Sequence, residues 1–484
     1  MTPEAVRRWG TAAVLALGAI GAGALALWQA RAGAVGIDRR DPAEPVRGGR
    51  HDKADAEAPE TVRIGERFER GPGRPGPAGA SWPGFRGPER DNIAPRTIPL
   101  ADWWPEGGPP RKWAVELGEG HAGAAIHGGR VYVLDYDESA RSDVLNCLSL
   151  EDGAVLWKRG YRVSIRRNHG MSRTVPAVAD RIVVSLGPRG HLMAVDAEEG
   201  SFLWGLDLER DWGATIPLWY TAQCPLVDGA TLVVAPGAPG ALLAGLDVAT
   251  GRILWKTPNP RGWKMSHSSV IPMTAAGRRM YVYAALGGVA GVSADPADIG
   301  RLLWECPDWS GRVVVPCPVP LGEDRLLLTA GYSAGGLLLR IVETQGRLEA
   351  RVERRWGPRE GLASEQQTPI CHQGFLYAVL PKDAGPRREQ LVCAPASDPL
   401  SFRWASGPEK RFGLGPFLVA DEKLFVLADD GRLTLARATP EGYRELAEAK
   451  VLEGVDAWAP LALAEGHLLL RDSRRMVCLD VRRR

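Results

Sequence analysis

Short runs of apolar residues, separated by Gly, Pro and Asp, follow one another from residue 111 to the C-terminus. Runs rich in Val, Leu, Ile and aromatic residues between such turn residues predict β-strands joined into hairpins. One stretch, residues 246–255 (Leu-Asp-Val-Ala-Thr-Gly-Arg-Ile-Leu-Trp), returns in related form at 150–157, 196–204 and 298–304. The pattern therefore predicts a repeated β-hairpin unit, in which Asp196, Asp247 and Asp480 are turn residues rather than catalytic carboxylates.

An aromatic residue closes each copy of this stretch. The series is Trp113, Trp157, Trp204, Trp255, Trp304, Trp356, Trp404 and, in a weaker copy, Tyr443. The copies lie about 40 to 50 residues apart, and most intervals begin with a strand that contains proline, such as Pro176, Pro225 or Pro318. Because the pattern gives four strands for each interval, it predicts the blades of a β-propeller.

The two ends of the repeated region complement each other. Residues 111–117 look like the last strand of a copy without a beginning, and the final copy, residues 458–481, ends after three strands. Pairing these segments closes the ring and removes open sheet edges. We therefore expect an all-β, eight-bladed propeller of four-stranded blades over residues 111–484. Seven blades is the alternative, because the copies that end at Trp356 and Tyr443 are weak.

The chain before the repeats divides into three parts. Residues 9–28 contain no charge, follow Arg7 and Arg8, and have a tryptophan at each end. This predicts one transmembrane helix within a membrane anchor over residues 1–31. A cleaved signal peptide is the alternative, since residues 30–32 (Ala-Arg-Ala) suit a cleavage site. Residues 32–80, rich in Pro, Gly and charge, predict a disordered tether. The non-repeated residues 81–110 are expected to pack as a lead-in across the outside of the domain.

This organisation predicts an inner-membrane anchor with the propeller in the periplasm or another extracytoplasmic space, or a secreted protein if the segment is cleaved. With 60 basic and 58 acidic residues the net charge is +2, so no nucleic-acid partner is predicted. None of the seven cysteines has a Cys-x-x-Cys neighbour. Cys147, Cys393 and Cys478 occupy small, buried repeat positions, whereas Cys306 with Cys317, or Cys371 with Cys393, could pair under oxidising conditions.

The candidate site lies just ahead of the first strands. In a propeller these strands line the central channel, so the residues before them converge at one end. Here polar and aromatic residues depart from the repeat, and the candidates are His169, Arg173, Trp219, Tyr220, Gln223, His267, Gln366 and Gln367. They suit stacking on a planar or sugar ring, hydrogen bonding, and an Arg173 contact with a carboxylate. The alternative is that they satisfy backbone groups and hold water in the channel.

A metal site is a further alternative at this end of the channel. His121, His169 and His267 occupy similar positions before their strands. Because no carboxylate accompanies them at a defined spacing, we predict no metal site.

The repeat Asp-x-x-[Ser/Thr]-Gly-x-x-x-Trp with its Pro-containing first strand resembles the pyrroloquinoline-quinone-like (PQQ-like) propeller family. That family includes quinone-dependent alcohol dehydrogenases and a propeller lipoprotein of outer-membrane protein assembly. The stretch Trp82-Pro83-Gly84-Phe85-Arg86-Gly87-Pro88 is also similar to the start of exported, membrane-tethered bacterial members. The resemblance covers residues 81–484 and implies the fold more firmly than the function.

The resemblance implies that a dehydrogenase would carry two adjacent cysteines and, in some members, a Cys-x-x-Cys-His haem site. Neither motif occurs in this sequence. We therefore expect a membrane-tethered binding or scaffold protein without catalytic activity, with an envelope protein or a small-molecule or sugar ligand as its partner. No cofactor is predicted. The alternative is a PQQ-dependent oxidoreductase, or another enzyme, with its site in the channel.

Overall fold

The computed structural model describes residues 62–309, 311–454 and 456–483. Its contacts divide the chain into two units, Met1–Thr61 and Val62–Arg484, and the propeller lies in the second. The expected membrane anchor over residues 1–31 lies outside the described residues. Within the described part of the chain, no helix has the length and apolar character that a bilayer crossing requires.

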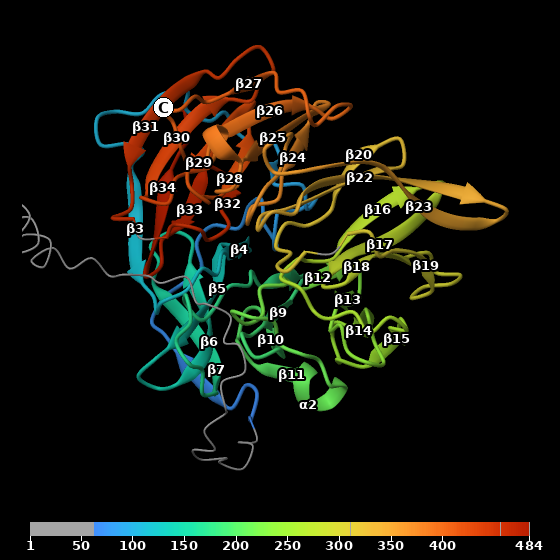
Figure 1. The fold of residues 1–484 in the computed structure, drawn as a ribbon. Coiled ribbons are helices and arrows are strands. Elements are labelled where there is room, and N and C mark those ends of the chain that lie inside the picture. The colour runs from blue at the N-terminus through green and yellow to red at the C-terminus, as the bar shows by residue number, and fades with distance from the viewer. Residues whose placement is uncertain (1–61, 310, 455, 484) are drawn as a thin grey trace, which may run out of the picture. The chain divides into compact units, whose positions relative to one another are not determined.

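Eight antiparallel sheets follow one another around a central axis (Figure 1), which confirms the prediction of eight blades. Blades 1 to 4 have the following strands. Blade 1 has β4 (Ala124–His127), β5 (Arg130–Asp137), β6 (Ser142–Ser149) and β7 (Val155–Arg162); blade 2 has β8 (Ala177–Ala179), β9 (Ile182–Leu186), β10 (His191–Asp196) and β11 (Phe202–Asp207); blade 3 has β12 (Leu226–Asp228), β13 (Thr231–Val234), β14 (Ala244–Asp247) and β15 (Ile253–Lys256); blade 4 has β16 (Ile271–Ala275), β17 (Arg278–Ala285), β18 (Gly288–Ser293) and β19 (Leu302–Cys306).

Blades 5 to 8 continue the ring. Blade 5 has β20 (Val319–Gly322), β21 (Arg325–Ala330), β22 (Gly335–Thr344) and β23 (Arg347–Trp356); blade 6 has β24 (Ile370–His372), β25 (Phe375–Val379), β26 (Leu391–Pro395) and β27 (Trp404–Ala405); blade 7 has β28 (Phe417–Ala420), β29 (Lys423–Leu427), β30 (Arg432–Arg437) and β31 (Glu445–Lys450); blade 8 has β32 (Ala462–Ala464), β33 (His467–Arg471), β34 (Arg475–Asp480) and β3 (Arg111–Glu116). The short helices α2 (Leu208–Trp212) and η1 (Gly385–Arg387) lie in connections, and β1 (Arg67–Arg70) and β2 (Ile93–Ala94) are added to blades 1 and 7.

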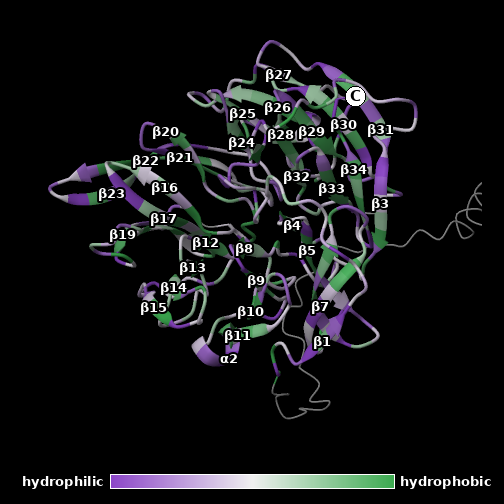
Figure 2. Cartoon of the chain, turned by 180° about the vertical axis from the view of Figure 1, so that it is seen from behind, coloured by the Kyte–Doolittle hydropathy of each residue, from purple (hydrophilic) through white to green (hydrophobic). Residues whose placement is uncertain are grey.

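Strand β3 closes the ring as predicted. It pairs antiparallel with β34, so that Ala114 lies opposite Val477 and Glu116 opposite Arg475. Blade 8 therefore consists of three strands from the end of the chain and one from the start of the propeller. Middle strands such as β21 and β30 are largely buried, whereas outer strands such as β23 and β31 are largely exposed and more hydrophilic in Figure 2.

The repeated Gly and Trp have a shared structural role. The indole of Trp157 in blade 1 lies against Gly200 in the turn of blade 2, and its Nε1–H donates to the Glu198 carbonyl at 3.1 Å. Trp204 contacts Gly251 of blade 3 in the same way. The same contact crosses the closure, where Trp113 lies against Gly153. These copies of the motif therefore each join a blade to the next one.

Replacing Gly200 with alanine is expected to destabilise the propeller by about 2 to 4 kcal/mol. A Cβ at this position would lie 2.6 Å from the Trp157 ring, and the backbone there has φ +68°. Gly346, with φ +72° and open space around it, provides the control that isolates backbone strain. Urea unfolding of both variants measures the difference. Equal losses would show that the contact with Trp157 contributes nothing.

The end of the expected tether is ordered. Strand β1 pairs with β7 on the outer edge of blade 1, where Phe68 lies opposite Arg159. The Arg159 guanidinium lies 4.2 Å from the centre of the Phe68 ring. Residues 62–80, which we expected to be disordered together with residues 32–61, thus lie on the propeller because β7 offers a free edge.

The lead-in does not cross the outside of the domain, contrary to expectation. It runs across the inner ends of the blades, where Trp82 pairs with Ile126 of β4, and the Val178 N–H of β8 donates to Pro83. Strand β2 then runs parallel to β28. A cavity of about 50 Å³ remains between the lead-in and the first strands of blades 2 to 4. An eight-bladed ring leaves a wide channel, and the lead-in fills one end of it.

Arg86 is the centre of this closure. Its side chain is buried, with Nε donating to Arg90 O at 2.9 Å, Nη2 to Asp91 O at 3.0 Å and Pro369 O at 3.3 Å, and Nη1 to Thr368 O at 3.2 Å. The guanidinium thereby connects the lead-in to blade 6. Buried carbonyl groups at the channel end need such donors, since no sheet partner reaches them.

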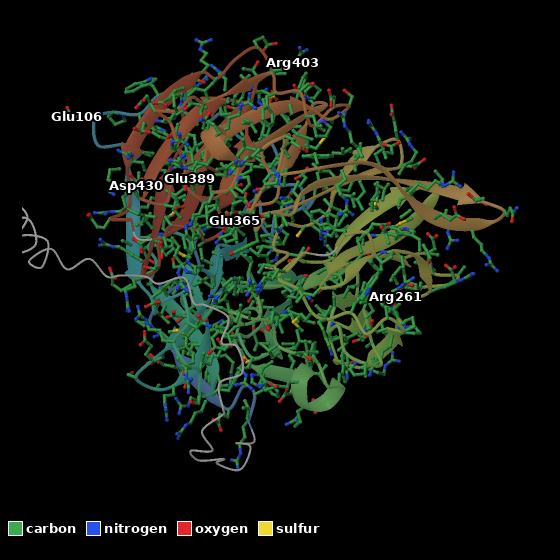
Figure 3. All side chains as sticks on the ribbon, viewed as in Figure 1. Glu106, Arg261, Glu365, Glu389, Arg403 and Asp430 are labelled. Atoms are coloured by element: carbon green, nitrogen blue, oxygen red, sulfur yellow. The ribbon has the colours of Figure 1, made fainter. Side chains whose placement is uncertain are left out.

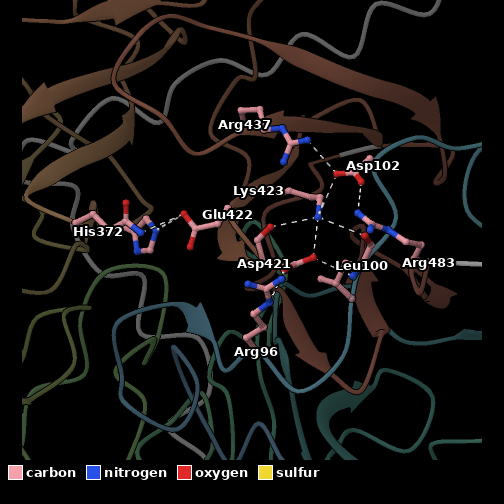
Figure 4. Close-up of polar contacts among 10 residues, drawn as sticks. Arg96, Leu100, Asp102, His372, Asp421, Glu422, Lys423, Arg437 and Arg483 are labelled. Carbon is pink, nitrogen blue, oxygen red and sulfur yellow. Dashed lines mark hydrogen bonds and ion pairs between the residues drawn. The ribbon is translucent and has the colours of Figure 1, made fainter.

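An ion cluster connects the later lead-in and the C-terminus to blade 7 (Figure 4). The buried Lys423 ammonium contacts Asp421 at 2.8 Å, Asp102 at 3.3 Å and the Leu100 carbonyl at 3.3 Å. Asp102 also pairs with Arg437 at 3.2 Å and with Arg483. The two ends of the propeller chain thus meet on the same charged side chains.

The seven cysteines are free, so neither the Cys306–Cys317 nor the Cys371–Cys393 pairing forms. Cys147, Cys393 and Cys478 are fully buried at their repeat positions, as predicted. Two others act as hydrogen-bond acceptors between first strands. The Val175 N–H donates to Cys224 Sγ at 3.2 Å, and the Ser269 N–H donates to Cys317 Sγ at 3.4 Å. These thiols therefore join neighbouring blades around the channel.

Candidate functional site

The candidate site lies at the end of the channel opposite the lead-in. The lead-in contacts the first strands themselves, whereas the predicted site residues precede those strands. Because every first strand follows the same direction in its blade, these two sets lie at opposite ends. We call the end formed by the segments before the first strands, together with the loops between second and third strands, the funnel.

Trp219 is the centre of an aromatic cluster in the funnel. The ring of His267 stacks with it at 6.3 Å between centroids and 25° between planes. His169 approaches it edge-on at 6.3 Å, and Tyr332 lies 6.2 Å away at 30°. Four different blades or connections supply these rings. The structure thus brings together three of the predicted residues, Trp219, His169 and His267.

Several of these residues have left-handed backbone. The φ angle is +50° at His169, +65° at Trp219, +70° at Tyr220 and +56° at Tyr332. Residues other than glycine adopt this conformation at a cost of about 1 to 3 kcal/mol, and such residues gather at ligand sites and active sites. In this fold the cost places large aromatic side chains at the mouth of the channel.

A second histidine and tryptophan pair lies on the other side of the funnel. The His121 and Trp458 rings lie 5.0 Å apart at 34°. Trp458 Nε1–H donates to Asp429 at 2.7 Å, and the Lys382 ammonium lies 5.8 Å from the centre of the Trp458 ring. Tyr332, Lys382, Asp429 and Trp458 were not predicted from the sequence. The first three lie in loops between second and third strands, and the opening of these loops at the funnel is the signal that could have found them.

Arg173, which we expected to contact a carboxylate, bonds main-chain groups of its own loop. Its guanidinium donates to the carbonyls of Asn168 at 3.0 Å, His169 at 2.7 Å and Gly170 at 2.8 Å. It therefore shapes the loop that carries His169. Burial lowers the pKa of Arg173 to about 10, so the side chain keeps its positive charge at neutral pH.

The remaining predicted residues have mainly structural contacts. The Gln223 amide is buried and bonds the main chain of Ala235 through both its oxygen and its nitrogen, at 2.8 and 2.9 Å. Tyr220 donates its hydroxyl to the Arg166 carbonyl at 2.5 Å. Gln367 donates to the Trp458 carbonyl at 3.2 Å, and the neighbouring Gln366 is half-buried. For Gln223 and Gln367 the structural alternative is the better description.

Acidic groups complete the wall on the side of blades 6 and 7. Glu365, which lies toward the middle of the ring in Figure 3, accepts a hydrogen bond from the Lys382 N–H at 3.2 Å. Burial raises the pKa of Glu365 and also that of Asp429. No group of three or more His, Cys, Asp or Glu among the residues that the structure describes has the arrangement of a metal site.

His121 and His267 are held uncharged. Burial, and then the charge of Arg173, lower the pKa of His267 to about 4 and that of His121 to about 3. Their imidazole rings are therefore neutral at pH 7. A neutral imidazole has one nitrogen that accepts a hydrogen bond, so each ring is available as an acceptor.

The stability of the protein is expected to fall as the pH drops from 7.5 to 5. The pKa of His267 is about 4 in the fold and 6.5 for the ordinary side chain, so the unfolded state takes up the proton first. The contribution of His267 is complete above pH 6.5 and is lost as the pH falls toward 4. By pH 5 the protein has lost about 2 kcal/mol of stability through this group. Urea unfolding at both pH values measures it.

Replacing His267 with glutamine should remove this part of the pH dependence. His127, half-buried at the end of β4, serves as the control, and His127→Gln should leave the slope as it is. A slope that His267→Gln does not change would contradict the burial of a neutral imidazole in the funnel.

A family model and solved structures that resemble this chain point to the same kind of propeller. A family model described as outer membrane protein assembly factor BamB matches residues 104–258 and 140–398. The crystal structure of BamB from Moraxella catarrhalis is similar, with 13% identity, a TM-score of 0.50, and coverage of 77% of this chain and 99% of that one. A europium-containing methanol dehydrogenase gives 13% identity, a TM-score of 0.55, and coverage of 81% and 89%.

At these identities the two solved structures show a shared fold only. A search of curated proteins finds no match. The family model, in contrast, covers more than half of the chain and agrees with the PQQ-like repeat that the sequence contains. The chain therefore belongs to the PQQ-like β-propeller family, the family that this BamB model describes.

Proposed function

We propose that this protein is a membrane-tethered binding or scaffold propeller of an extracytoplasmic space, and that its funnel holds a ligand or part of an envelope partner. The observation that supports this function is the cluster of left-handed aromatic residues around Trp219. Packing alone does not require strained aromatic side chains at the mouth of a channel that is filled at its other end. The uncharged segment within residues 1–31 would serve as the membrane anchor.

A PQQ-dependent oxidoreductase is the alternative that the family suggests. Trp219 suits stacking on the planar quinone, but the carboxylates of PQQ need hydrogen-bond donors and cations. The donors of Arg173 already bind carbonyls of its own loop, and the Gln223 amide already bonds Ala235. The divalent ion that accompanies PQQ also needs several oxygen ligands, and no suitable group of carboxylates lies among the described residues. The funnel residues do not fit this cofactor, and we derive no redox step from it.

Affinity capture from native envelope extract tests the proposal. The full chain should retain one defined partner or ligand, and Trp219→Ala with Tyr332→Ala should abolish retention. Leu254→Ala, which changes an exposed side chain on the outer strand β15, is the control. Membrane fractionation should place the full chain with the membrane and a chain that starts at residue 32 in the soluble fraction. A stoichiometric quinone spectrum after incubation with PQQ and Ca²⁺ would overturn the proposal.

A further inference from the structure

Two histidines of the funnel carry a buried ring nitrogen without a partner. Nδ1 of His267 and Nδ1 of His121 are shielded from water and have no hydrogen-bond partner among the described residues. His267 itself is only 7% exposed. A buried polar atom without a partner destabilises the fold, so native proteins pair such atoms with protein, water or ligand. Two of them at one channel mouth indicate groups that a ligand pairs.

Each of these histidines lies against a tryptophan. His267 stacks with Trp219, and His121 lies beside Trp458. The positive charge of Arg173 lowers the pKa of both histidines, so Arg173 lies near each of them. The funnel therefore repeats one arrangement twice around Arg173, with an aromatic face and a neutral acceptor on each side. A ligand that uses both sides must combine flat apolar surface with hydrogen-bond donors.

The charges around Arg173 disfavour an ionic ligand. An anion gains most from arginine when the guanidinium offers a free pair of N–H groups, and three carbonyls already occupy these groups. A cation would be repelled by the positive charge of Arg173 at short distance. The carboxylate that acts on Arg173 is Glu119, which is 9% exposed and already accepts from Arg167 and from the Gly170 N–H. The centre of the funnel thus suits an uncharged molecule.

A sugar ring has the required combination. Its C–H face is flat and apolar and packs on indole and phenol rings, while its hydroxyl groups point outward as donors. Tyr332, which is 46% exposed and lies 6.2 Å from Trp219, extends the aromatic surface toward solvent. The Trp219 and Tyr332 rings together offer a stacking surface for one sugar ring and for the next sugar of an oligosaccharide.

We propose that the funnel binds a neutral oligosaccharide, with one sugar ring on Trp219 and hydroxyl groups donating to Nδ1 of His267 and of His121. This inference rests on the proposed function of the funnel as a ligand site and names the chemical class of its ligand. The sugar does not react, and the histidines act only as acceptors.

Ligand-observed NMR with the full chain in detergent tests the inference. The uncharged probes are maltohexaose, chitohexaose and a set of other neutral oligosaccharides. An oligogalacturonate is the anionic probe, and a glucosamine hexamer is the cationic probe. At least one neutral sugar should bind, and Trp219→Ala and His267→Leu should each weaken it at least tenfold. Leu254→Ala should leave binding unchanged. Tyr332→Ser replaces Trp219→Ala if that variant does not fold, as judged by its urea unfolding.

Binding of the charged sugars as tight as that of neutral ones would overturn the inference, and so would neutral binding that the funnel variants do not alter. Failure of every sugar to bind would also overturn it. The proposed function has a separate outcome. If no sugar binds but native extract still yields a partner that depends on Trp219, only the sugar is wrong. If the funnel variants alter neither result, the funnel is not a ligand site.

Discussion

Replacing Arg86 with methionine is expected to destabilise the propeller by about 3 to 5 kcal/mol. The side chain is buried and donates to four main-chain carbonyls, two in the lead-in and two just before β24. Methionine fills similar space but leaves these carbonyls without donors at the inner end of the channel. Urea unfolding followed by tryptophan fluorescence measures the loss.

A second arginine of the lead-in provides the control. Arg96 pairs with Asp421 at 3.0 Å, but its side chain is 74% exposed. Exposed ion pairs contribute less than about 1 kcal/mol, so Arg96→Met should change stability little. If both variants lost the same stability, the special position of Arg86 in the channel would be contradicted.

Replacing Arg111–Glu116 by a Gly-Ser run of equal length is expected to cost more than about 5 kcal/mol and to broaden unfolding. This change removes β3, leaves blade 8 with three strands, and takes the Trp113 indole away from Gly153. Both sides of the closure then present free edges.

The same replacement over Arg67–Arg70 is the matched control. Strand β1 also lies at the outer edge of a blade, but blade 1 has four strands without it and all four residues of β1 are exposed. We expect a loss of about 1 to 2 kcal/mol and unchanged cooperativity. Equal effects of the two replacements would mean that β3 is only an additional edge strand.

The architecture could be predicted from the sequence because it repeats. Several blades use the same turn and the same contact between neighbours, so Gly200 and Trp157 recur with their equivalents at a regular interval. Asp247 confirms its predicted role, since its carboxylate accepts from the N–H groups of Ala249 and Thr250 in the turn. The closing strand β3 could be predicted for the same reason, because Trp113 belongs to the series of tryptophans that end the repeats.

Features that occur once could not be predicted in this way. The lead-in contains buried Trp82 and Arg86, but nothing in their order indicates that they enter the channel rather than cover its outside. Their position depends on carbonyls from blades far away in the sequence, such as Thr368. The membrane anchor lies outside the described residues and remains a prediction.

The sequence predicted which residues would come close together at the funnel only in part. Funnel residues depart from the repeat either because they face a ligand or because they satisfy local backbone, and the sequence cannot distinguish these reasons. Trp219 and His267 belong to the aromatic cluster, whereas Arg173 and Gln223 bond main-chain groups. Trp458 stands at the start of the last copy, where the repeat gives no sign that its ring lies beside His121.

Native-state hydrogen exchange of β34 tests the closed ring most directly. In the intact protein the amides of Val477 and Cys478, which lie opposite Ala114 and Trp113, should exchange only through global unfolding, with the same protection as Phe425 in β29. After β3 is replaced, these β34 amides should lose that protection while β29 keeps more of its own. If β34 in the intact protein exchanges much faster than β29, or if replacing β3 does not change it, the strand pairing does not hold the propeller closed.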